Sequence, residues 1–150
     1  MRRYFYWVDF SYITKNGDKS RFDLGVFSSL TKARNKIDMS ADSCGFRDYP
    51  KSNFTIDKIG VDFDYEVTDK SNLTLYFVCH EYEPENEEVG VSYYSYWGYY
   101  STIKEAEERI EYVKAHSRLG KKYPDCFEII KVRVDNLNAW SEGFVELDCG

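Results

Sequence analysis

The chain has 150 residues, enough for one ordinary domain or two very small ones. Hydrophobic residues make up 43% and charged residues 31%, which excludes a disordered chain, and no apolar run is long enough to cross a bilayer. The net charge of −6 argues against direct nucleic-acid binding, because proteins that bind nucleic acids gather Lys and Arg to neutralise phosphates.

The first predicted strand is YFYWVDFSY, residues 4–12, which has apolar side chains on both of its faces. We therefore expect a central strand that is covered on both sides. The Asn-Gly pair of KNGD, residues 15–18, predicts a tight hairpin that leads into a second strand, RFDLGVF, residues 21–27. Because strand side chains alternate, Leu24 and Val26 are expected to face the same core.

A helix is predicted next, with Ser29 as its N-cap. Leu30, Ala33 and Ile37 fall on one helical face, which we expect to pack against the sheet. The third strand of this half is FTIDKIGV, residues 54–61.

The second half of the chain repeats the first. Three stretches recur in the same order and at matching spacing: 6–12 as 76–82, 24–37 as 97–110, and 45–62 as 120–135 with a one-residue slip. In the second half Thr102 and Glu105 form a T-x-x-E capping box at the start of the helix, and the last strand is predicted over 127–134. The chain is therefore predicted to consist of two repeats, 1–70 and 71–150, in one compact unit.

Each repeat reads as strand, strand, helix, strand. A hairpin followed by a helix that crosses one sheet face returns the third strand beside the first, in the antiparallel order 2-1-3. The predicted fold class is α+β, with two tandem ββαβ repeats, antiparallel sheets, one helix per repeat and a pseudo-twofold axis. The apolar faces left uncovered either pack against each other or belong to one merged sheet.

Four motifs carry a resemblance. The first repeat contains GVFSS (25–29) and GFRDYP (45–50), and the second contains HEYE (80–83) and WSEGF (140–144). With these motifs the unit resembles an uncharacterised bacterial and phage domain family. The resemblance implies a fold and a bacterial or phage source but no chemistry. Neither copy is complete: the first lacks the opening His and the W-x-E-G-F tail, and the second has GKKYP for GFRDYP.

The residues needed for catalysis are missing. His80 adjoins Cys79 in a strand, where neighbouring side chains point to opposite faces, so the two cannot act as a dyad. His116 stands near a helix C-terminus, where an imidazole is favourable for electrostatic reasons alone. Asp62, Asp64 and Glu66 alternate in a segment that lacks the pattern of a calcium-binding loop, and no glycine-rich phosphate-binding motif occurs. We expect no enzyme activity, no bound metal and no cofactor.

YYSYWGYY, residues 93–100, is the most aromatic stretch of the chain. Laid over the first repeat, it has Tyr94 and Tyr96 in place of Arg21 and Asp23. The two tyrosines either cover the seam between the repeats or mark a binding patch.

GFRDYP has two interpretations of its own. Phe46 and Tyr49 could anchor a loop on the core, with Arg47 and Asp48 paired or solvated. Alternatively, Arg47, Asp48 and Tyr49 form a binding surface, since Arg and Tyr are enriched among binding anchors.

An acidic run, EYEPENEEVG, occupies residues 81–90. We expect a hairpin tip there. Its glutamates could dock on a basic protein surface or imitate phosphates. The candidate binding residues in this run are Glu83, Glu85, Glu87 and Glu88.

The N-terminus reads as a strand and not as a signal peptide, and the four cysteines form no CxxC pair, so we expect free thiols and a cytoplasmic protein. The predicted function is non-enzymatic binding of another protein, as a stoichiometric inhibitor from a phage or bacterium. The alternative is a module that binds a small ligand or nucleotide in an aromatic cleft between the repeats. We expect a monomer or homodimer without membrane association.

Overall fold

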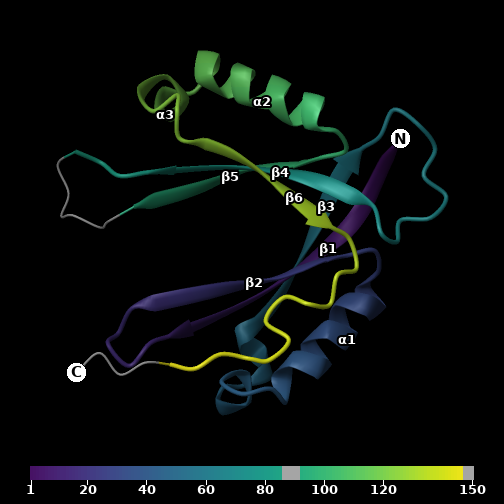
Figure 1. Cartoon of the computed structure of the whole chain (residues 1–150), viewed down its shortest axis with the longest axis vertical. Coiled ribbons are helices and arrows are strands. Elements are labelled where there is room, and N and C mark those ends of the chain that lie inside the picture. Colours follow the sequence, from purple (N-terminus) through teal and green to yellow (C-terminus); the bar gives the residue numbers. More distant parts are fainter. Residues whose placement is uncertain (86–91, 147–150) are drawn as a thin grey trace.

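The computed structural model describes residues 1–85 and 92–146, in which six strands form two separate antiparallel sheets (Figure 1). In the first half, β1 (Arg2–Ile13) lies between β2 (Lys19–Phe27) and β3 (Phe54–Asp62), and α1 (Leu30–Ala41) covers one face. The predicted order 2-1-3 and the central position of the first strand are confirmed.

The second half has the same topology. Here β4 (Thr74–Tyr82) lies between β5 (Tyr93–Tyr100) and β6 (Phe127–Arg133), and α2 (Ile103–His116) covers the sheet. The sheets of the two halves stay separate and do not merge, which answers the question that the repeats left open.

Three short helical turns were not predicted. They are η1 (Phe46–Asp48), η2 (Lys51–Asn53) and α3 (Arg118–Lys122). The expectation of one helix per repeat is therefore wrong for the second half. The extra helix α3 forms because the Ser117 hydroxyl caps it by accepting a hydrogen bond from the backbone N–H of Gly120.

The two predicted N-caps are confirmed. The Ser29 hydroxyl accepts from the backbone N–H of Lys32 at 3.2 Å, and the Thr102 hydroxyl accepts from that of Glu105 at 3.1 Å. Each long helix therefore starts at a side chain that satisfies an otherwise unpaired donor. The return bond of the predicted capping box differs: the Glu105 carboxylate accepts from the Ser101 hydroxyl at 3.3 Å and not from the Thr102 N–H.

A bulge in β2 overturns one prediction. Gly25 has φ +114°, and the pairing of β1 with β2 shifts register beside it. The extra residue turns Leu24 towards α1 and Val26 towards the other sheet, so the two do not share a face. A positive φ is open to glycine at little steric cost, which is why the chain can place the bulge here.

The second half repeats this bulge at Gly98, with φ +102°. As a result Trp97 packs on the α2 side of its sheet and Tyr99 packs between the sheets. Simple alternation, as expected for their counterparts Leu24 and Val26, would have put these two rings on one face.

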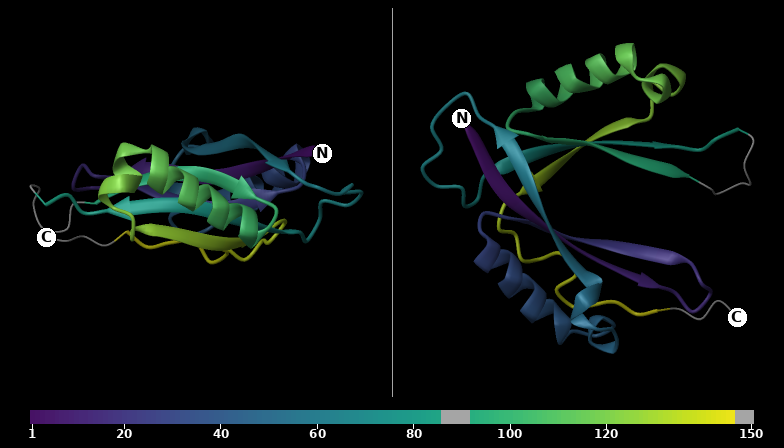
Figure 2. Two further views of the ribbon diagram at one scale, coloured as in Figure 1. Left: turned by 90° about the horizontal axis from the view of Figure 1, so that it is seen from above. Right: turned by 180° about the vertical axis from the view of Figure 1, so that it is seen from behind.

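The molecule is built in layers: α1, the first sheet, the second sheet and α2 (Figures 1 and 2). The core between the sheets is made of buried side chains from both halves: Phe5, Val26, Val61, Phe63, Val67, Leu75, Phe77, Cys79, Tyr99 and Val134. A second core lies between the first sheet and α1, and a smaller one lies under α2. Both faces of β1 are thus covered, as predicted.

After β6 the chain returns to the first half. The backbone N–H of Asp135 donates to the Val26 carbonyl at 2.9 Å, and its carboxylate accepts from the backbone N–H and the hydroxyl of Ser28. The Lys32 ammonium on α1 donates to the same carboxylate at 3.0 Å. Asp135 therefore links the end of one sheet to the start of the other half's helix.

The C-terminal segment 135–146 then runs along the α1 side of the first sheet (Figure 1). Lys36, only 1% exposed, donates to the carbonyls of Leu137 at 3.0 Å and Ala139 at 2.8 Å. Phe144 ends the path inside the core under α1. The W-x-E-G-F tail of the second repeat thus completes the core of the first.

Asp135 generates a prediction about acid stability. Burial opposes its ionisation, but the hydrogen bonds from Ser28 and the pairing with Lys32 outweigh burial and hold the pKa of Asp135 below its ordinary value. A lowered pKa stabilises the fold above the unfolded-state value of about 3.9, and that stability is lost as the pH falls through the folded-state pKa. Urea unfolding should show that the free energy of unfolding falls less for Asp135→Asn than for wild type when the pH is lowered from about 5 to about 2. Equal losses would contradict this role.

Lys36→Met should lower the free energy of unfolding by about 2–3 kcal/mol, because it keeps the buried stem but leaves two carbonyls without their charged donor. Denaturant unfolding measures the loss. Lys104→Met, an exposed change on α2, is the matched control and should cost less than about 0.5 kcal/mol.

Candidate binding cleft between the hairpins

The two sheets diverge towards their hairpins. The β1–β2 and β4–β5 hairpins extend in the same direction and spread apart (Figures 1 and 2). Between them lies a cavity of about 350 Å³, called the inter-sheet cleft below. It is lined by residues of both halves: Trp7, Arg21, Asp23, Phe77, Tyr94, Tyr96, Ile130 and Val132.

The wall formed by the first sheet is polar. Asp9, 4% exposed, pairs with Arg21 and accepts from the Thr55 hydroxyl. The Arg21 guanidinium lies 4.7 Å from the centre of the Trp7 ring, and the Trp7 indole N–H donates to Asp23 at 2.9 Å. The buried carboxylate of Asp9 is tolerable because it is paired and hydrogen-bonded, and the same contacts fix the guanidinium over the indole.

The wall formed by the second sheet is aromatic and apolar. Tyr94, Tyr96 and Ile130 are 46%, 44% and 37% exposed. The Tyr96 ring packs on Phe77 at 5.3 Å and meets Trp7 of the first half edge-on at 5.5 Å. Tyr96 therefore belongs both to the seam between the halves and to the exposed surface of the cleft.

The contrast between the walls comes from substitutions at equivalent positions of the two repeats. Three residues of the polar wall are replaced in the second repeat by residues of the aromatic wall. Cys79 stands at the position of Asp9, Tyr94 at that of Arg21, and Tyr96 at that of Asp23. Full closure of the sheets would desolvate the polar wall against rings that offer few hydrogen bonds, which is unfavourable. The difference between the two walls is thus a result of divergence between the copies.

Tyr94 and Cys79 interact inside the aromatic wall. Burial, followed by a hydrogen bond with Cys79, raises the pKa of Tyr94 above its ordinary value, and burial also raises the pKa of the Cys79 thiol. Both groups therefore stay neutral at physiological pH. A neutral thiol is a poor nucleophile, so this pair suits binding better than covalent chemistry.

The other candidate residues lie elsewhere. Arg47 and Asp48 are exposed on η1, whose Phe46 is fully buried while Tyr49 packs against the same core. The Tyr49 hydroxyl donates to Glu146 at 2.8 Å, and this bond raises the pKa of Tyr49 to about 12. The structure thus places Phe46 and Tyr49 as core anchors and does not bring Arg47 and Asp48 to the cleft.

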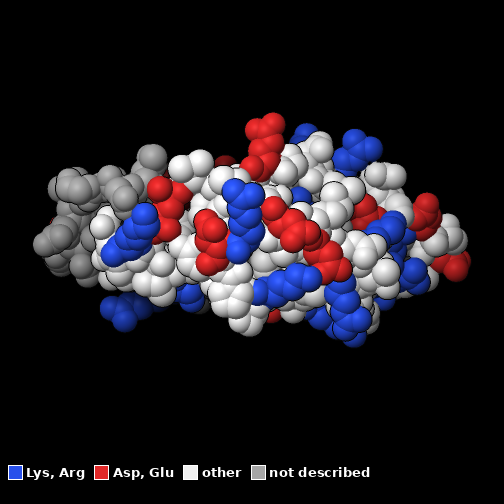
Figure 3. All heavy atoms as spheres, turned by 90° about the horizontal axis from the view of Figure 1, so that it is seen from below, with Lys and Arg blue, Asp and Glu red and all other residues white. Residues whose placement is uncertain are grey.

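Of the acidic run, Glu83 and Glu85 follow β4 and are exposed. Glu87 and Glu88 lie outside the described residues. On the face that carries α1, Lys and Arg are interspersed with Asp and Glu, without a patch of one sign (Figure 3).

His80 is fully buried on the α2 side of β4, away from the face that Cys79 occupies, and its Nε2 lies 2.9 Å from the Tyr123 carbonyl. The predicted separation of these two side chains is confirmed. Within residues 1–85 and 92–146, no three His, Cys, Asp or Glu side chains are grouped closely enough to hold a metal ion. No helix of this part of the chain is both long and apolar enough to cross a membrane.

Reasoning from the sequence missed Trp7, Arg21 and Ile130 as lining residues of the cleft. The available signal was the replacement pattern itself, because positions that are polar in one copy and aromatic in the other mark the faces where the copies meet. Comparison of the chain with models of protein families, with curated proteins and with solved structures finds no match. The likeness to the bacterial and phage family stays a prediction from the motifs.

The two tyrosines should differ in their importance for folding. Tyr96→Ala removes ring contacts with both Trp7 and Phe77 and should lower the free energy of unfolding by about 1–2 kcal/mol. Tyr94→Ala should lower the free energy of unfolding by less than about 1 kcal/mol. The ring contact that it removes is with Tyr96 of the same strand and does not join the two halves. Denaturant unfolding of the two variants tests this order, and a larger loss for Tyr94→Ala would contradict it.

Proposed function

We propose that the chain is a non-enzymatic protein-binding module that holds a side chain or loop of a partner protein in the inter-sheet cleft. The observation that carries the proposal is an open aromatic wall, with Tyr94, Tyr96 and Ile130 exposed, facing an arginine held over a tryptophan. Tyr, Trp and Arg are the residue types that dominate binding hot spots.

The side chains of the inter-sheet cleft are already held in place. Arg21 is fixed by Asp9 and Trp7, and Tyr96 by Phe77 and Trp7, so the cleft loses little side-chain freedom on binding. The partner offers an apolar or aromatic side chain to the second wall and a polar group to Asp23 or Arg21. Basic residues beside that side chain complement the exposed Glu83 and Glu85 at the end of β4.

In this proposal the chain is a stoichiometric inhibitor of phage or bacterial origin, of the anti-defence or immunity type. It works in the cytoplasm of a bacterial cell or of a phage-infected host, as a monomer or homodimer. The motif resemblance supports the source, and the small size and the lack of a catalytic residue set in the sequence support binding over turnover.

A second candidate is a small aromatic ligand or nucleotide bound in the same cleft. The observation that favours it is the meeting of Trp7, Phe77 and Tyr96 from both halves around a cavity of about 350 Å³, a volume within the usual range for small-molecule sites. Stacking on these rings would supply its binding energy.

Site-specific crosslinking tests the first candidate. Tyr94 is replaced by the photoreactive p-benzoylphenylalanine, and the protein is irradiated in an extract of cells from its own host. We expect one discrete protein adduct, with one partner per chain by native mass spectrometry. The same replacement at Tyr65, which is 51% exposed outside the cleft, is the control and should give none.

The double variant Tyr94→Arg, Tyr96→Asp installs the first repeat's residues and should weaken partner binding by about thirtyfold or more, as loss of a hot spot does. Circular dichroism verifies that the variant is folded. Equal adducts at Tyr94 and Tyr65 would refute the protein partner. Strong thermal stabilisation by one compound of a metabolite panel, lost in the double variant, would establish the second candidate instead.

A further inference from the structure

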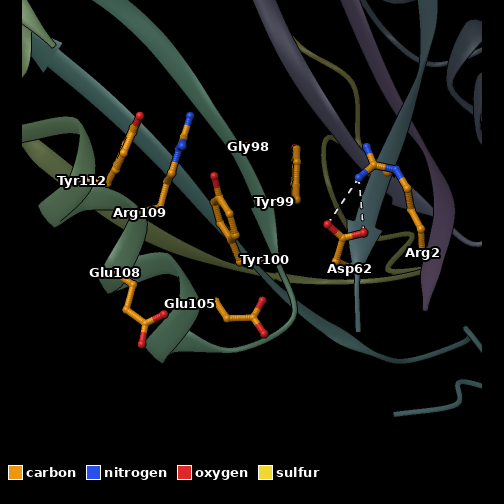
Figure 4. A pocket seen from close by; sticks show the side chains of 10 residues that line it. Arg2, Asp62, Gly98, Tyr99, Tyr100, Glu105, Glu108, Arg109 and Tyr112 are labelled. Carbon is orange, nitrogen blue, oxygen red and sulfur yellow. Dashed lines mark hydrogen bonds and ion pairs between the residues drawn. The ribbon is translucent and has the colours of Figure 1, made fainter. Parts of the chain in front are cut away.

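A second cavity, of about 520 Å³, lies beside α2, between that helix, the end of β5 and the paired ends of β1 and β3. We name it the α2 groove and define it by six of its lining residues: Asp62, Tyr100, Glu105, Glu108, Arg109 and Tyr112. Figure 4 shows Tyr100, Arg109 and Tyr112 side by side, with the Arg2–Asp62 ion pair facing them.

The first half has an equivalent cavity beside α1. Its lining residues match those of the α2 groove at a constant spacing in the repeat: Phe27 for Tyr100, Lys32 for Glu105, Asn35 for Glu108, Met39 for Tyr112, and Asp135 for Asp62. The two cavities are therefore the same feature of the fold, seen once in each half.

In the first half this place already holds a segment of the chain itself. The chain's own residues 135–139 cross α1, with Leu137 lining the cavity. Lys36 donates to the carbonyls of Leu137 and Ala139, which fixes the backbone of the segment against the helix.

The second half has no such segment in the described chain, because the residues after β3 leave in another direction. The N-terminal ammonium donates to the Phe63 carbonyl, and the Phe63 N–H donates to the Met1 carbonyl, which leads Phe63 into the core between the sheets. The side of α2 that corresponds to the path of the C-terminal segment thus stays uncovered in residues 1–85 and 92–146.

Arg109 occupies the position of Lys36. Its Nε is buried and has no hydrogen-bond partner in the described part of the chain, and its guanidinium lies 5.1 Å from the centre of the Tyr112 ring. The guanidinium offers several N–H donors, and its terminal nitrogens can donate to an incoming peptide carbonyl as Lys36 donates to those of Leu137 and Ala139.

The charge of the groove selects the occupant. Where α1 has Lys32 and Asn35, α2 has Glu105 and Glu108, and Asp62 is exposed beside them with its carboxylate 3.3 Å from Arg2. Asp62 is already paired with Arg2, so the carboxylates that can attract a cationic side chain are those of Glu105 and Glu108, whereas in the first half Lys32 is paired with Asp135.

We propose that the α2 groove binds a segment of a partner protein that carries Lys or Arg. The segment crosses α2 as residues 135–139 cross α1. Arg109 donates to its backbone carbonyls, and Glu105 and Glu108 pair with its basic side chains. This site is separate from the inter-sheet cleft, since none of these three residues lines that cleft. Either site can therefore fail its test without affecting the other.

A phage-displayed library of random peptides, selected on the intact protein, tests the proposal. We expect the enriched peptides to be rich in Lys and Arg. Synthetic copies, measured by fluorescence polarisation, should bind the Glu108→Lys variant about tenfold more weakly than wild type, because an attractive pair becomes a repulsive one. Glu107→Lys is the matched control: it makes the same charge change at an exposed neighbour on α2 that does not line the groove, and it should bind like wild type.

Arg109→Met should also weaken the peptides by about tenfold, through loss of a charge-assisted hydrogen bond to the backbone. Circular dichroism reports whether each variant is folded. If Arg109→Met does not fold, the comparison of Glu108→Lys with Glu107→Lys still tests the proposal. Failure to enrich any peptide, or equal binding by Glu108→Lys and Glu107→Lys, would overturn the proposal.

Discussion

The packing of the two sheets against each other, closed at one end and open to a cavity at the other, is the constraint on which the rest of the molecule depends. Phe5, Phe77 and Tyr99 close that end as a buried core. At the other end the first sheet presents Asp9 and Arg21, which are satisfied by each other and by neighbours in their own half. There Arg21 lies 5.6 Å from the centre of the Tyr96 ring of the opposite sheet and Trp7 meets the same ring edge-on, and the inter-sheet cleft is the space beside these rings.

The two halves depend on each other through the C-terminal segment. Phe144 from the second repeat fills the core under α1, and Lys36 from the first repeat holds the backbone that brings it there. The incompleteness of each copy, which the motifs already showed, thus has a physical meaning: one tail serves the first half, and the second half is left without one. Both proposed sites follow from this kind of divergence between copies.

Much of the fold could be predicted from the sequence, because its signals are local. The Asn-Gly turn, the caps at Ser29 and Thr102, and the doubly apolar first strand each determine their own neighbourhood. The faces of Leu24 and Trp97 could not be predicted by alternation, because a bulge at a glycine shifts every side chain beyond it by one position. Such a bulge is visible only in the pairing with the neighbouring strand.

The two proposed sites were harder to predict, because each is lined by residues of both halves and depends on how the halves pack together. Tyr96 could be singled out from the alignment of the copies, but its contact with Trp7 depends on the stacking of the sheets. Arg109 gave no signal of its own: at its position the first copy has a lysine, and basic residues on helices are ordinarily solvated. Arg109 became a candidate only through its counterpart, Lys36. Lys36 is buried and donates to two backbone carbonyls, so the first half shows how a peptide is held at this position. In a duplicated fold, a contact that one copy makes within the chain therefore indicates what the other copy is shaped to bind.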